Sequence, residues 1–142
     1  MFCAIVAGEA PAIRIYEDDD YLAILDIRPF TRGHTLVIPK KHTVDLTDTP
    51  AETLADMVTI GQRIAKAARA TELADATNVG INDGSAAFQS VSHIHLHVLP
   101  RFADDGFKLS VRFLAPERAD LDATAASIRA ACREPTGSAT PS

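Results

Sequence analysis

The sequence predicts an α+β domain: a mostly antiparallel five-stranded sheet with one main helix and a shorter C-terminal helix. Two observations support this fold class. Five short runs of strand-forming residues are separated by turn signals, and one long stretch near the middle of the chain has apolar residues at helical spacing. The first two runs are predicted to form a hairpin, so we expect a mostly antiparallel sheet with the helices against one face.

The first forty residues predict a helical turn and three strands. Apolar residues near the start suggest a turn of helix that ends close to Gly8. Residues 13–17 alternate between apolar and polar side chains and predict a strand. Residues 21–27 are almost continuously apolar and predict a buried strand, which pairs with the first across the acidic turn at 18–20. Residues 34–39 alternate again and predict the third strand.

The main helix is predicted to begin at residues 49–52. Thr49 is a suitable N-cap, Pro50 suits the first helical position, and Glu52 supplies the acid of a capping box. From there to Ala68, apolar residues recur at helical spacing while most charged residues fall elsewhere. The simplest interpretation of this apolar stripe is packing against the core.

Two further strands and a second helix follow. Residues 77–81 and 91–99 predict strands, joined by a glycine-containing loop at 82–87. Beyond Pro100 the pattern is weaker, and residues 107–113 suggest an irregular or edge segment. Four residues at helical intervals then suggest the shorter helix: Leu121, Ala125, Ile128 and Cys132.

The composition is typical of one soluble globular domain. The chain has 142 residues, of which 46% are hydrophobic and 23% charged, which is enough to bury a core. We expect a single domain over residues 1–133 and a disordered tail, rich in small polar residues, at 134–142.

Charge and hydropathy argue against two classes of partner. A net charge of −5 argues against a nucleic-acid-binding protein, which would carry clustered basic residues. No apolar run approaches the ~20 residues of a membrane span, and the N-terminus lacks the basic region of a secretory signal. Cys3 and Cys132 lie far apart in the sequence, so we expect reduced thiols and a cytoplasmic location.

Three of the five histidines in the chain lie in one short segment. His93, His95 and His97 alternate with aliphatic residues, so on a strand the three imidazoles would share one face, spaced by ~6.6 Å. A polar sheet face without a function is more simply made from threonine, lysine or glutamate, because histidine has only a middling preference for strands. This row is therefore the main candidate site.

A row of imidazoles suits two kinds of chemistry. A neutral imidazole is already nucleophilic, and neighbouring imidazoles can donate hydrogen bonds to phosphate oxygens, so the row suits attack at phosphorus. Two histidines at positions i and i+2 can also bind zinc, with a third ligand from elsewhere. The spacing alone leaves both possibilities open, and we place phosphoryl chemistry first.

The segment 93–99 resembles the motif of the histidine triad family of nucleotide hydrolases and transferases, in which three histidines alternate with hydrophobic residues. Upstream segments resemble the family in the same order along the chain, so the resemblance covers roughly the first hundred residues. These segments are 2–9, 26–27, 33–42, 82–84 and 89–90. The resemblance implies the fold of that family, and an enzyme that hydrolyses a nucleotide phosphoramidate or a dinucleoside polyphosphate.

The resemblance also implies catalytic roles. His95 would attack the α-phosphorus to form a nucleotidyl-histidine, which water then hydrolyses to release a nucleoside monophosphate. His97 would bond the phosphate, and His93 would orient the nucleophile through a link to His34. Two residues would contact phosphate oxygens or the leaving group: Gln89 and Ser90. Because some relatives that transfer nucleotides have glutamine in place of the third histidine, His97 favours hydrolysis.

The same resemblance implies a nucleotide-binding site. Asp26 would bind the ribose hydroxyls and Asn82 would support the phosphate. An apolar slot for the base, expected to be a purine, would be formed by Ile27, Phe2, Ile5 and Leu36. Structural roles compete with these assignments: Asp26 also suits the turn before Pro29, Asn82 suits a turn of its own, and the aliphatic residues suit the core.

The resemblance also bears on metal binding and on the oligomeric state. Many bacterial relatives hold a structural zinc with Cys-x-x-Cys and two histidines, whereas Cys3 stands alone here and would leave three ligands with His42 and His93. Closed structural zinc sites have four ligands, so we expect no tightly bound metal and no cofactor. The resemblance further implies a homodimer joined edge to edge. Two alternatives remain: a nucleotide-binding scaffold with little activity, and a metal-dependent hydrolase using the histidine row.

Overall fold

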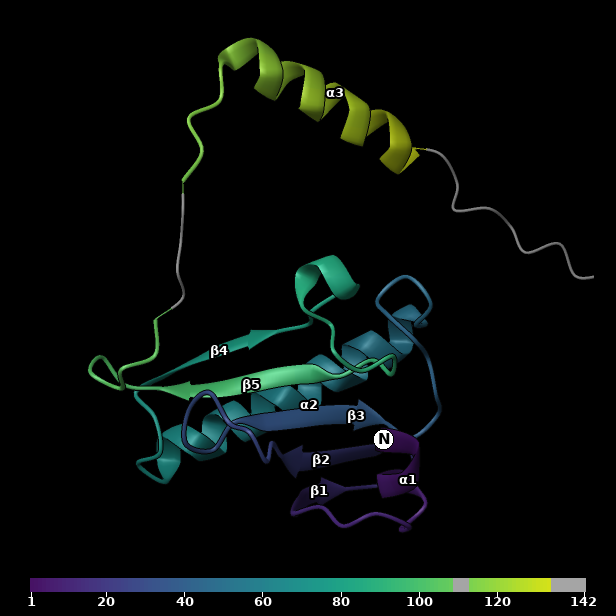
Figure 1. Ribbon diagram of the computed structural model, residues 1–142, viewed down its shortest axis with the longest axis vertical. Helices are drawn as coiled ribbons and strands as arrows, with labels where there is room; N and C mark the ends of the chain where they lie inside the picture. The colour runs from purple at the N-terminus through teal and green to yellow at the C-terminus, as the bar shows by residue number, and fades with distance from the viewer. Residues whose placement is uncertain (109–112, 134–142) are drawn as a thin grey trace, which may run out of the picture. The chain divides into compact units, whose positions relative to one another are not determined.

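The computed structural model describes residues 1–108 and 113–133 (Figure 1). Its elements are α1 (Phe2–Val6), β1 (Arg14–Glu17), β2 (Tyr21–Leu25), β3 (Thr35–Pro39), α2 (Ala51–Ala70), β4 (Ala76–Gly80), the 3₁₀ turn η1 (Ser85–Ala87), β5 (Leu96–Arg101) and α3 (Arg118–Arg133). The chain divides into two compact units, Met1–Phe107 with all five strands and Lys108–Ser142 with α3. The single domain expected over 1–133 stays a prediction, and the expected tail at 134–142 lies outside the described residues.

The five strands form one antiparallel sheet in the order β1-β2-β3-β5-β4. This arrangement confirms the predicted α+β fold class. β5 lies between β3 and β4, so His97 pairs with Leu36 on one side and with Gly80 on the other. β1 and β4 are the edges of the sheet, and the edge-to-edge homodimer stays a prediction.

The acidic turn between β1 and β2 forms as predicted. Asp18 Oδ1 accepts hydrogen bonds from the backbone N–H groups of Asp20 at 2.9 Å and Tyr21 at 2.7 Å. A side chain that bonds the backbone two and three residues later fixes a tight turn. The hairpin therefore follows from local chemistry as well as from the apolar pattern.

α2 covers one face of the sheet. Its buried residues Met57 and Ile60 pack against strand and loop side chains that point to this side: Tyr21, Ala23, Val37, Ile94, Leu96 and Val98. Gly61 permits the close approach of helix and strand, because a Cβ at this position would lie 2.8 Å from Leu96 Cδ2. The apolar stripe is thus core packing, as the sequence indicates.

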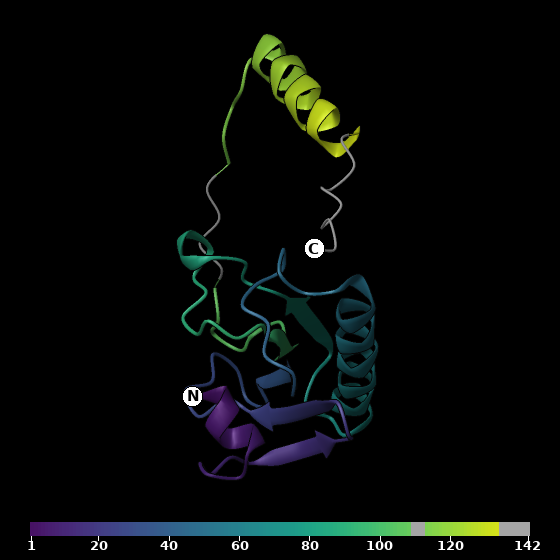
Figure 2. The same ribbon diagram turned by 90° about the vertical axis from the view of Figure 1, so that its right-hand side faces the viewer.

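α1 packs against the opposite face, and Figure 2 shows α1 and α2 on opposite sides of the sheet. Phe2 and Ile5 form a second buried cluster with the other parity of strand residues: Leu22, Ile24, Leu36 and Ile38. The main helix α2 covers one face as expected, whereas the short helical turn α1 covers the other. Residues 21–25 are apolar at every position, so both faces of β2 need a cover, and the short α1 supplies the second one.

The start of α2 differs from the prediction. Pro50 occupies the N-cap position and no side chain caps the helix, which begins at Ala51. The Thr49 hydroxyl instead donates to the carbonyl oxygen of Asp45 at 2.6 Å and lies 2.8 Å from the Thr43 hydroxyl. The capping pattern located the start of the helix correctly. Thr49 does not cap the helix, because its hydroxyl bonds the loop before the helix.

The histidine-bearing strand also starts later than predicted. β5 begins at Leu96 and runs to Arg101, whereas residues 91–95 form no strand. The backbone N–H of Ile94 bonds the carbonyl of Thr43 at 2.8 Å, and this loop contact replaces a strand ladder there.

The predicted second helix is confirmed as α3, and residues 109–112 of the expected irregular segment lie outside the described residues. Within the described ranges, no helix has the length and apolar character to cross a membrane.

Candidate active site

The three histidines keep their alternation although only His97 lies in β5. Ile94, Leu96 and Val98 point into the core under α2. The imidazoles lie on the side covered by α1, where the Phe2 ring meets those of His93 and His95 edge-on at centroid distances of 5.8 Å and 5.1 Å. The His95 and His97 rings are 4.9 Å apart, closer than an extended strand would place them.

His95 presents one nitrogen as a free base. Its Nδ1–H donates to the backbone carbonyl of His93 at 2.8 Å, which leaves the lone pair on Nε2. No group among the described residues bonds that Nε2. The side chain is 6% exposed, and burial lowers the pKa of His95 below its usual range. The imidazole is therefore neutral near pH 7, the form in which it can act as a nucleophile.

A chain of hydrogen bonds fixes the proton on His97. The backbone N–H of Phe30 donates to His34 Nδ1 at 3.3 Å, so the proton of the neutral imidazole is on Nε2. His34 Nε2–H then donates to His97 Nδ1 at 2.9 Å. By the same reasoning, His97 carries its proton on Nε2. Gly33, with φ of +86°, turns the chain so that His34 lies directly before β3.

The predicted link between His93 and His34 is wrong. His34 bonds His97 instead, because the register pairs Leu36 with His97 and leaves His34 diagonal to His97 on the same face. His93 turns away and donates from Nε2 to the carbonyl of Pro39 at 2.8 Å. It still bears on the nucleophile, since its own carbonyl accepts the bond from His95 Nδ1.

The Nε2–H of His97 is buried and has no partner among the described residues. A buried donor without an acceptor costs about 1–3 kcal/mol, and native structures keep such groups where they have a role. The His97 ring lies beside the His95 ring, with their centroids 4.9 Å apart. The site thus offers a nucleophile beside a donor that lacks an acceptor, an arrangement that an anionic oxygen on the attacked atom would complete.

His97 gives a pH prediction. Burial lowers the pKa of His97 to about 4, with smaller lowering effects from His95 and His34 and an opposing effect from Asp26. The unfolded chain titrates near 6.5, so between pH 6.5 and 4 it binds more protons than the folded state. The free energy of unfolding should therefore fall as the pH drops through this window.

We expect His97→Gln, whose amide oxygen can accept the bond from His34, to weaken this pH dependence. Urea unfolding at pH 7 and pH 5 measures it. The wild-type protein should lose more stability between the two pH values than the variant does. Equal losses would contradict the assignment of a neutral, buried His97.

A second cluster lies next to the row. Cys3 Sγ is 3.3 Å from His42 Nδ1 and 3.6 Å from His93 Nδ1, and the three ligand atoms lie within 4.8 Å of one another. Sulfur and nitrogen ligands of a tetrahedral zinc are about 3.6 Å apart, given the usual bond lengths. The bond from His93 Nε2 to Pro39 also leaves Nδ1 free as a ligand. These residues fit a metal ion with three ligands, and no fourth is found within 1–108 and 113–133.

The predicted nucleotide contacts are only partly brought together. Asp26 lies beside the row, with Oδ2 3.7 Å from His34 Nδ1, and its Oδ1 also accepts the N–H of Arg28 at 2.9 Å in the expected turn. Three residues of the predicted base slot are buried in the α1 cluster: Phe2, Ile5 and Leu36. Ile27 is 86% exposed and lies outside that cluster.

Gln89 has a structural role in this structure. Its amide accepts from the N–H of Gly84 at 2.8 Å and donates to the carbonyls of Val44 and Val91 at 2.7 Å and 2.9 Å. It thereby ties three loop segments together, and because both N–H donors are in use, a hydrogen bond from Gln89 to a phosphate oxygen would require one of these bonds to break. Ser90 is exposed and Asn82 partly buried. Their substrate contacts stay predictions.

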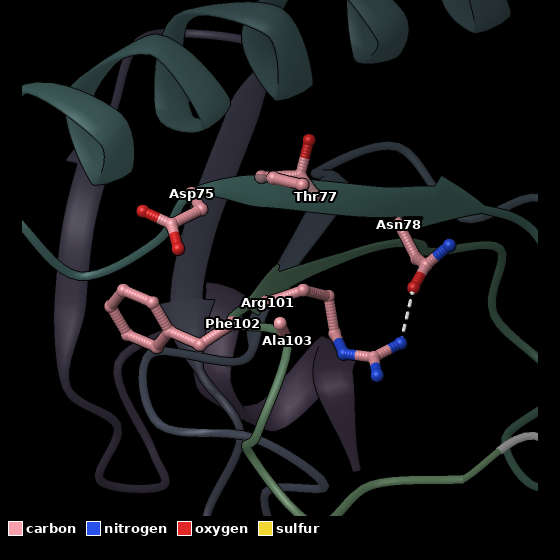
Figure 3. Close-up of a pocket in the computed structure, with 7 residues that line it drawn as sticks. Asp75, Thr77, Asn78, Arg101, Phe102 and Ala103 are labelled. Carbon is pink, nitrogen blue, oxygen red and sulfur yellow. Dashed lines mark hydrogen bonds between the residues drawn. The ribbon is translucent and has the colours of Figure 1, made fainter.

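Sequence reasoning missed Phe30, whose backbone sets the tautomer of His34 and whose ring stacks on it at 5.5 Å. A backbone donor leaves no pattern in a sequence. A hollow of about 370 Å³ lies elsewhere, lined by residues of β4, the end of β5 and the segments beside them (Figure 3). None of the histidines lines it, so it is separate from the row.

The sheet order and the three alternating histidines, located in β5 and directly before it, define a histidine triad protein. The HIT domain family model matches residues 7–104. The chain belongs to the HIT family.

Relatives and solved structures agree with this assignment. The uncharacterized HIT-like protein MT1300 of Mycobacterium tuberculosis is 67% identical over 131 residues, which cover 92% of this chain and 91% of that protein. A Zn-bound histidine triad family protein from Mycobacterium smegmatis is 60% identical with a TM-score of 0.74, covering 92% of this chain and 95% of that one. The SMU.412c protein of Streptococcus mutans, 38% identical, has a TM-score of 0.87 over 94% and 85%.

Two relatives have names that state an activity. The adenylylsulfatase HINT3 of Arabidopsis thaliana is 41% identical over 101 residues, which cover 71% of this chain and 51% of that protein. The adenosine 5′-monophosphoramidase HNT1 of Saccharomyces cerevisiae is 41% identical over 101 residues, covering 71% and 61%. The HIT family thus includes nucleotide hydrolases.

Proposed function

We propose that the protein hydrolyses a nucleotide at its α-phosphorus and releases a nucleoside monophosphate. The observation that carries this proposal is a pair of nitrogens, Nε2 of His95 and the Nε2–H of His97, neither of which has a hydrogen-bond partner among the described residues. Burial keeps both rings neutral by lowering their pKa values, and hydrogen bonds to other groups define their tautomers. A nucleophile and an adjacent oxyanion donor are the two parts that displacement at phosphorus requires.

The reaction has two steps. His95 Nε2 forms a bond to the α-phosphorus while the bond from phosphorus to the leaving group breaks, and the leaving group departs with the electron pair. Water then attacks the same phosphorus, the bond to His95 breaks with its electron pair returning to Nε2, and the proton lost by the water passes to the released leaving group or to solvent. In both steps the Nε2–H of His97 would donate to an oxygen on the phosphorus, where charge builds up.

The names of two relatives guide the choice of substrates. Adenosine 5′-phosphoramidate, adenosine 5′-phosphosulfate and a diadenosine polyphosphate share an adenylyl α-phosphorus and differ in the leaving group. Release of AMP from each, measured by chromatography, tests the proposal. Turnover of at least one supports it. Stabilisation against heat by AMP without any turnover would instead favour a binding module.

The metal-dependent alternative, with His93 and His95 as joint ligands, has no support in the geometry. The cluster of possible ligands includes His93 but not His95. His93 uses Nε2 on Pro39 and directs Nδ1 at Cys3, and His95 uses Nδ1 on a carbonyl. The row and the cluster therefore share one residue and have separate tasks.

For the cluster itself, we propose a weakly held zinc. Cys3, His42 and His93 would bind it, and its contribution would be to tie α1 to the loop before β5. With three protein ligands we expect less than one zinc per chain after dialysis, and an increase in Tm when zinc is added back. Elemental analysis and thermal unfolding measure both.

Cys3→Ser is the matched variant, because it keeps the size of the side chain and removes the thiolate. It should abolish the effect of zinc on Tm. Stoichiometric zinc that survives a chelator would contradict a three-ligand site and indicate a closed one.

A further inference from the structure

The Phe30 ring packs against the imidazole of His34, and Phe107, in the loop after β5, packs against the Phe30 ring. Phe30 stacks on His34 with ring planes at 19° and centroids 5.5 Å apart. The Phe30 side chain belongs to the turn before β3 and is 64% exposed, so its own burial does little to fix it. Its other aromatic contact is Phe107, at 5.7 Å and 30°. Stacked aromatic rings at these distances attract one another beyond the effect of the area they bury.

Phe107 is fixed through both its ring and its backbone. The guanidinium carbon of Arg101 lies 4.8 Å from the centre of the ring, within the range of a cation–π contact. Arg101 Nη2 also donates to the carbonyl of Phe107 at 3.0 Å, and the N–H of Phe107 donates to Asp105 Oδ1 at 3.0 Å. These contacts come from Arg101, the last residue of β5, and from Asp105 in the loop that follows it.

Arg101 is itself anchored on the sheet. Its Nε lies 2.7 Å from Asp105 Oδ2, and its Nη1 donates to Asn78 Oδ1 at 2.8 Å. Figure 3 shows the guanidinium and the Asn78 amide pointing toward each other beside β4 and β5. A loop constrained in this way places one phenyl ring at a fixed position against Phe30.

The position of the Phe30 ring affects the tautomer of His97 through His34. The 2.9 Å bond from His34 Nε2 to His97 Nδ1 needs a fixed His34 ring, and this bond decides which nitrogen of His97 carries the proton. If Phe30 swung away, water would reach His34 beside Asp26, whose Oδ2 is 3.7 Å from Nδ1. A looser His34 would leave His97 in a mixture of tautomers, only one of which donates from Nε2.

We propose that Phe107 is a positioning residue, which acts through Phe30 to hold His34 and so keeps the Nε2–H of His97 available to the phosphate. The proposal rests on the proposed function. Phe107 touches neither His95 nor His97 among the described aromatic contacts. Its loss should therefore slow the chemical step more than it weakens nucleotide binding.

Steady-state kinetics of three variants test this. Phe107→Ala should lower kcat about tenfold with KM changed less than about twofold, since small displacements of catalytic groups cost 10–100-fold in rate. Phe107→Tyr keeps the stack and should restore kcat. Phe102→Ala removes a partly exposed ring from the same loop that is outside the stack and should leave kcat unchanged.

A spectroscopic measurement separates positioning from general destabilisation. In full-length ¹⁵N-labelled protein, the imidazole nitrogens of His34 should show a single Nε2–H tautomer, and Phe107→Ala should shift them toward a mixture. The groups that face His34 are Asp26, His95 and His97. Burial lowers the pKa of His34, so the added water should move the acid limb of the kcat profile to higher pH.

The outcomes are distinct. Phe107→Ala with unchanged kcat and unchanged His34 signals overturns the proposal, as would a loss of kcat equal to that of Phe102→Ala. If instead a His95 variant kept its turnover, the proposed function would fail, while the ¹⁵N signals would still decide whether Phe107 holds His34.

Discussion

His95→Asn should lower kcat by about 10³-fold or more while leaving the fold intact. The nucleophile supplies the bond to phosphorus, and removal of such a group in other enzymes costs several orders of magnitude. Asparagine can still donate to the His93 carbonyl that now receives His95 Nδ1–H, so little strain follows. Release of nucleoside monophosphate, measured at saturating substrate, gives the effect on kcat. Binding of AMP, measured by calorimetry, should change little.

His42→Asn is the matched control. It replaces the histidine that belongs neither to the row of three nor to the bond between His34 and His97, and its side chain is exposed. Its turnover should stay close to that of the wild-type protein. A His95 variant with more than a tenth of the wild-type kcat would rule out His95 as the nucleophile.

Gly61→Val should cost about 1–3 kcal/mol of stability. A Cβ at Gly61 would lie 2.8 Å from Leu96 Cδ2 and 3.6 Å from Val98 Cγ2, and both of these side chains are buried. Valine adds two further carbons in the same space and is a poorer helix former than alanine. Leu96 lies between His95 and His97 in the chain, so a displaced β5 should also lower kcat.

Gly80→Val provides the comparison for this substitution. A Cβ at Gly80 would meet nothing within 4 Å, and valine suits a strand. Its stability should lie within about 0.5 kcal/mol of wild type. Urea unfolding of both variants measures the difference. Equal stabilities would show that α2 and β5 do not approach each other as closely at Gly61 as the structure indicates.

The fold was predictable where short-range pattern and tertiary packing agree. The apolar run predicted a buried strand over 21–27, of which Tyr21–Leu25 forms β2, and the acidic turn at Asp18 predicted the hairpin. The prediction failed where a loop contact decides the structure. The backbone N–H of Ile94 bonds the carbonyl of Thr43, which is far away in sequence. Side chains at 91–95 therefore alternate between two sides although these residues form no strand.

The candidate site divides in the same way. Alternation alone placed His93, His95 and His97 on one side, and the parity of β3 placed His34 with them. The partners of each nitrogen were beyond prediction, because backbone groups supply several of them: the carbonyls of His93 and Pro39 and the N–H of Phe30. Which histidine bonds which depends on the register between β3 and β5, and no local pattern encodes that register.

The most direct test is to look for the bond between His95 and phosphorus. The protein is mixed with an intact substrate that it is known to hydrolyse, and the reaction is quenched in alkali within milliseconds to seconds. The quenched protein is then digested and analysed by mass spectrometry. The peptide that contains His95 should carry one nucleoside monophosphoryl group, transiently and in step with turnover. Continued turnover with no modified histidine at any time point would contradict the account.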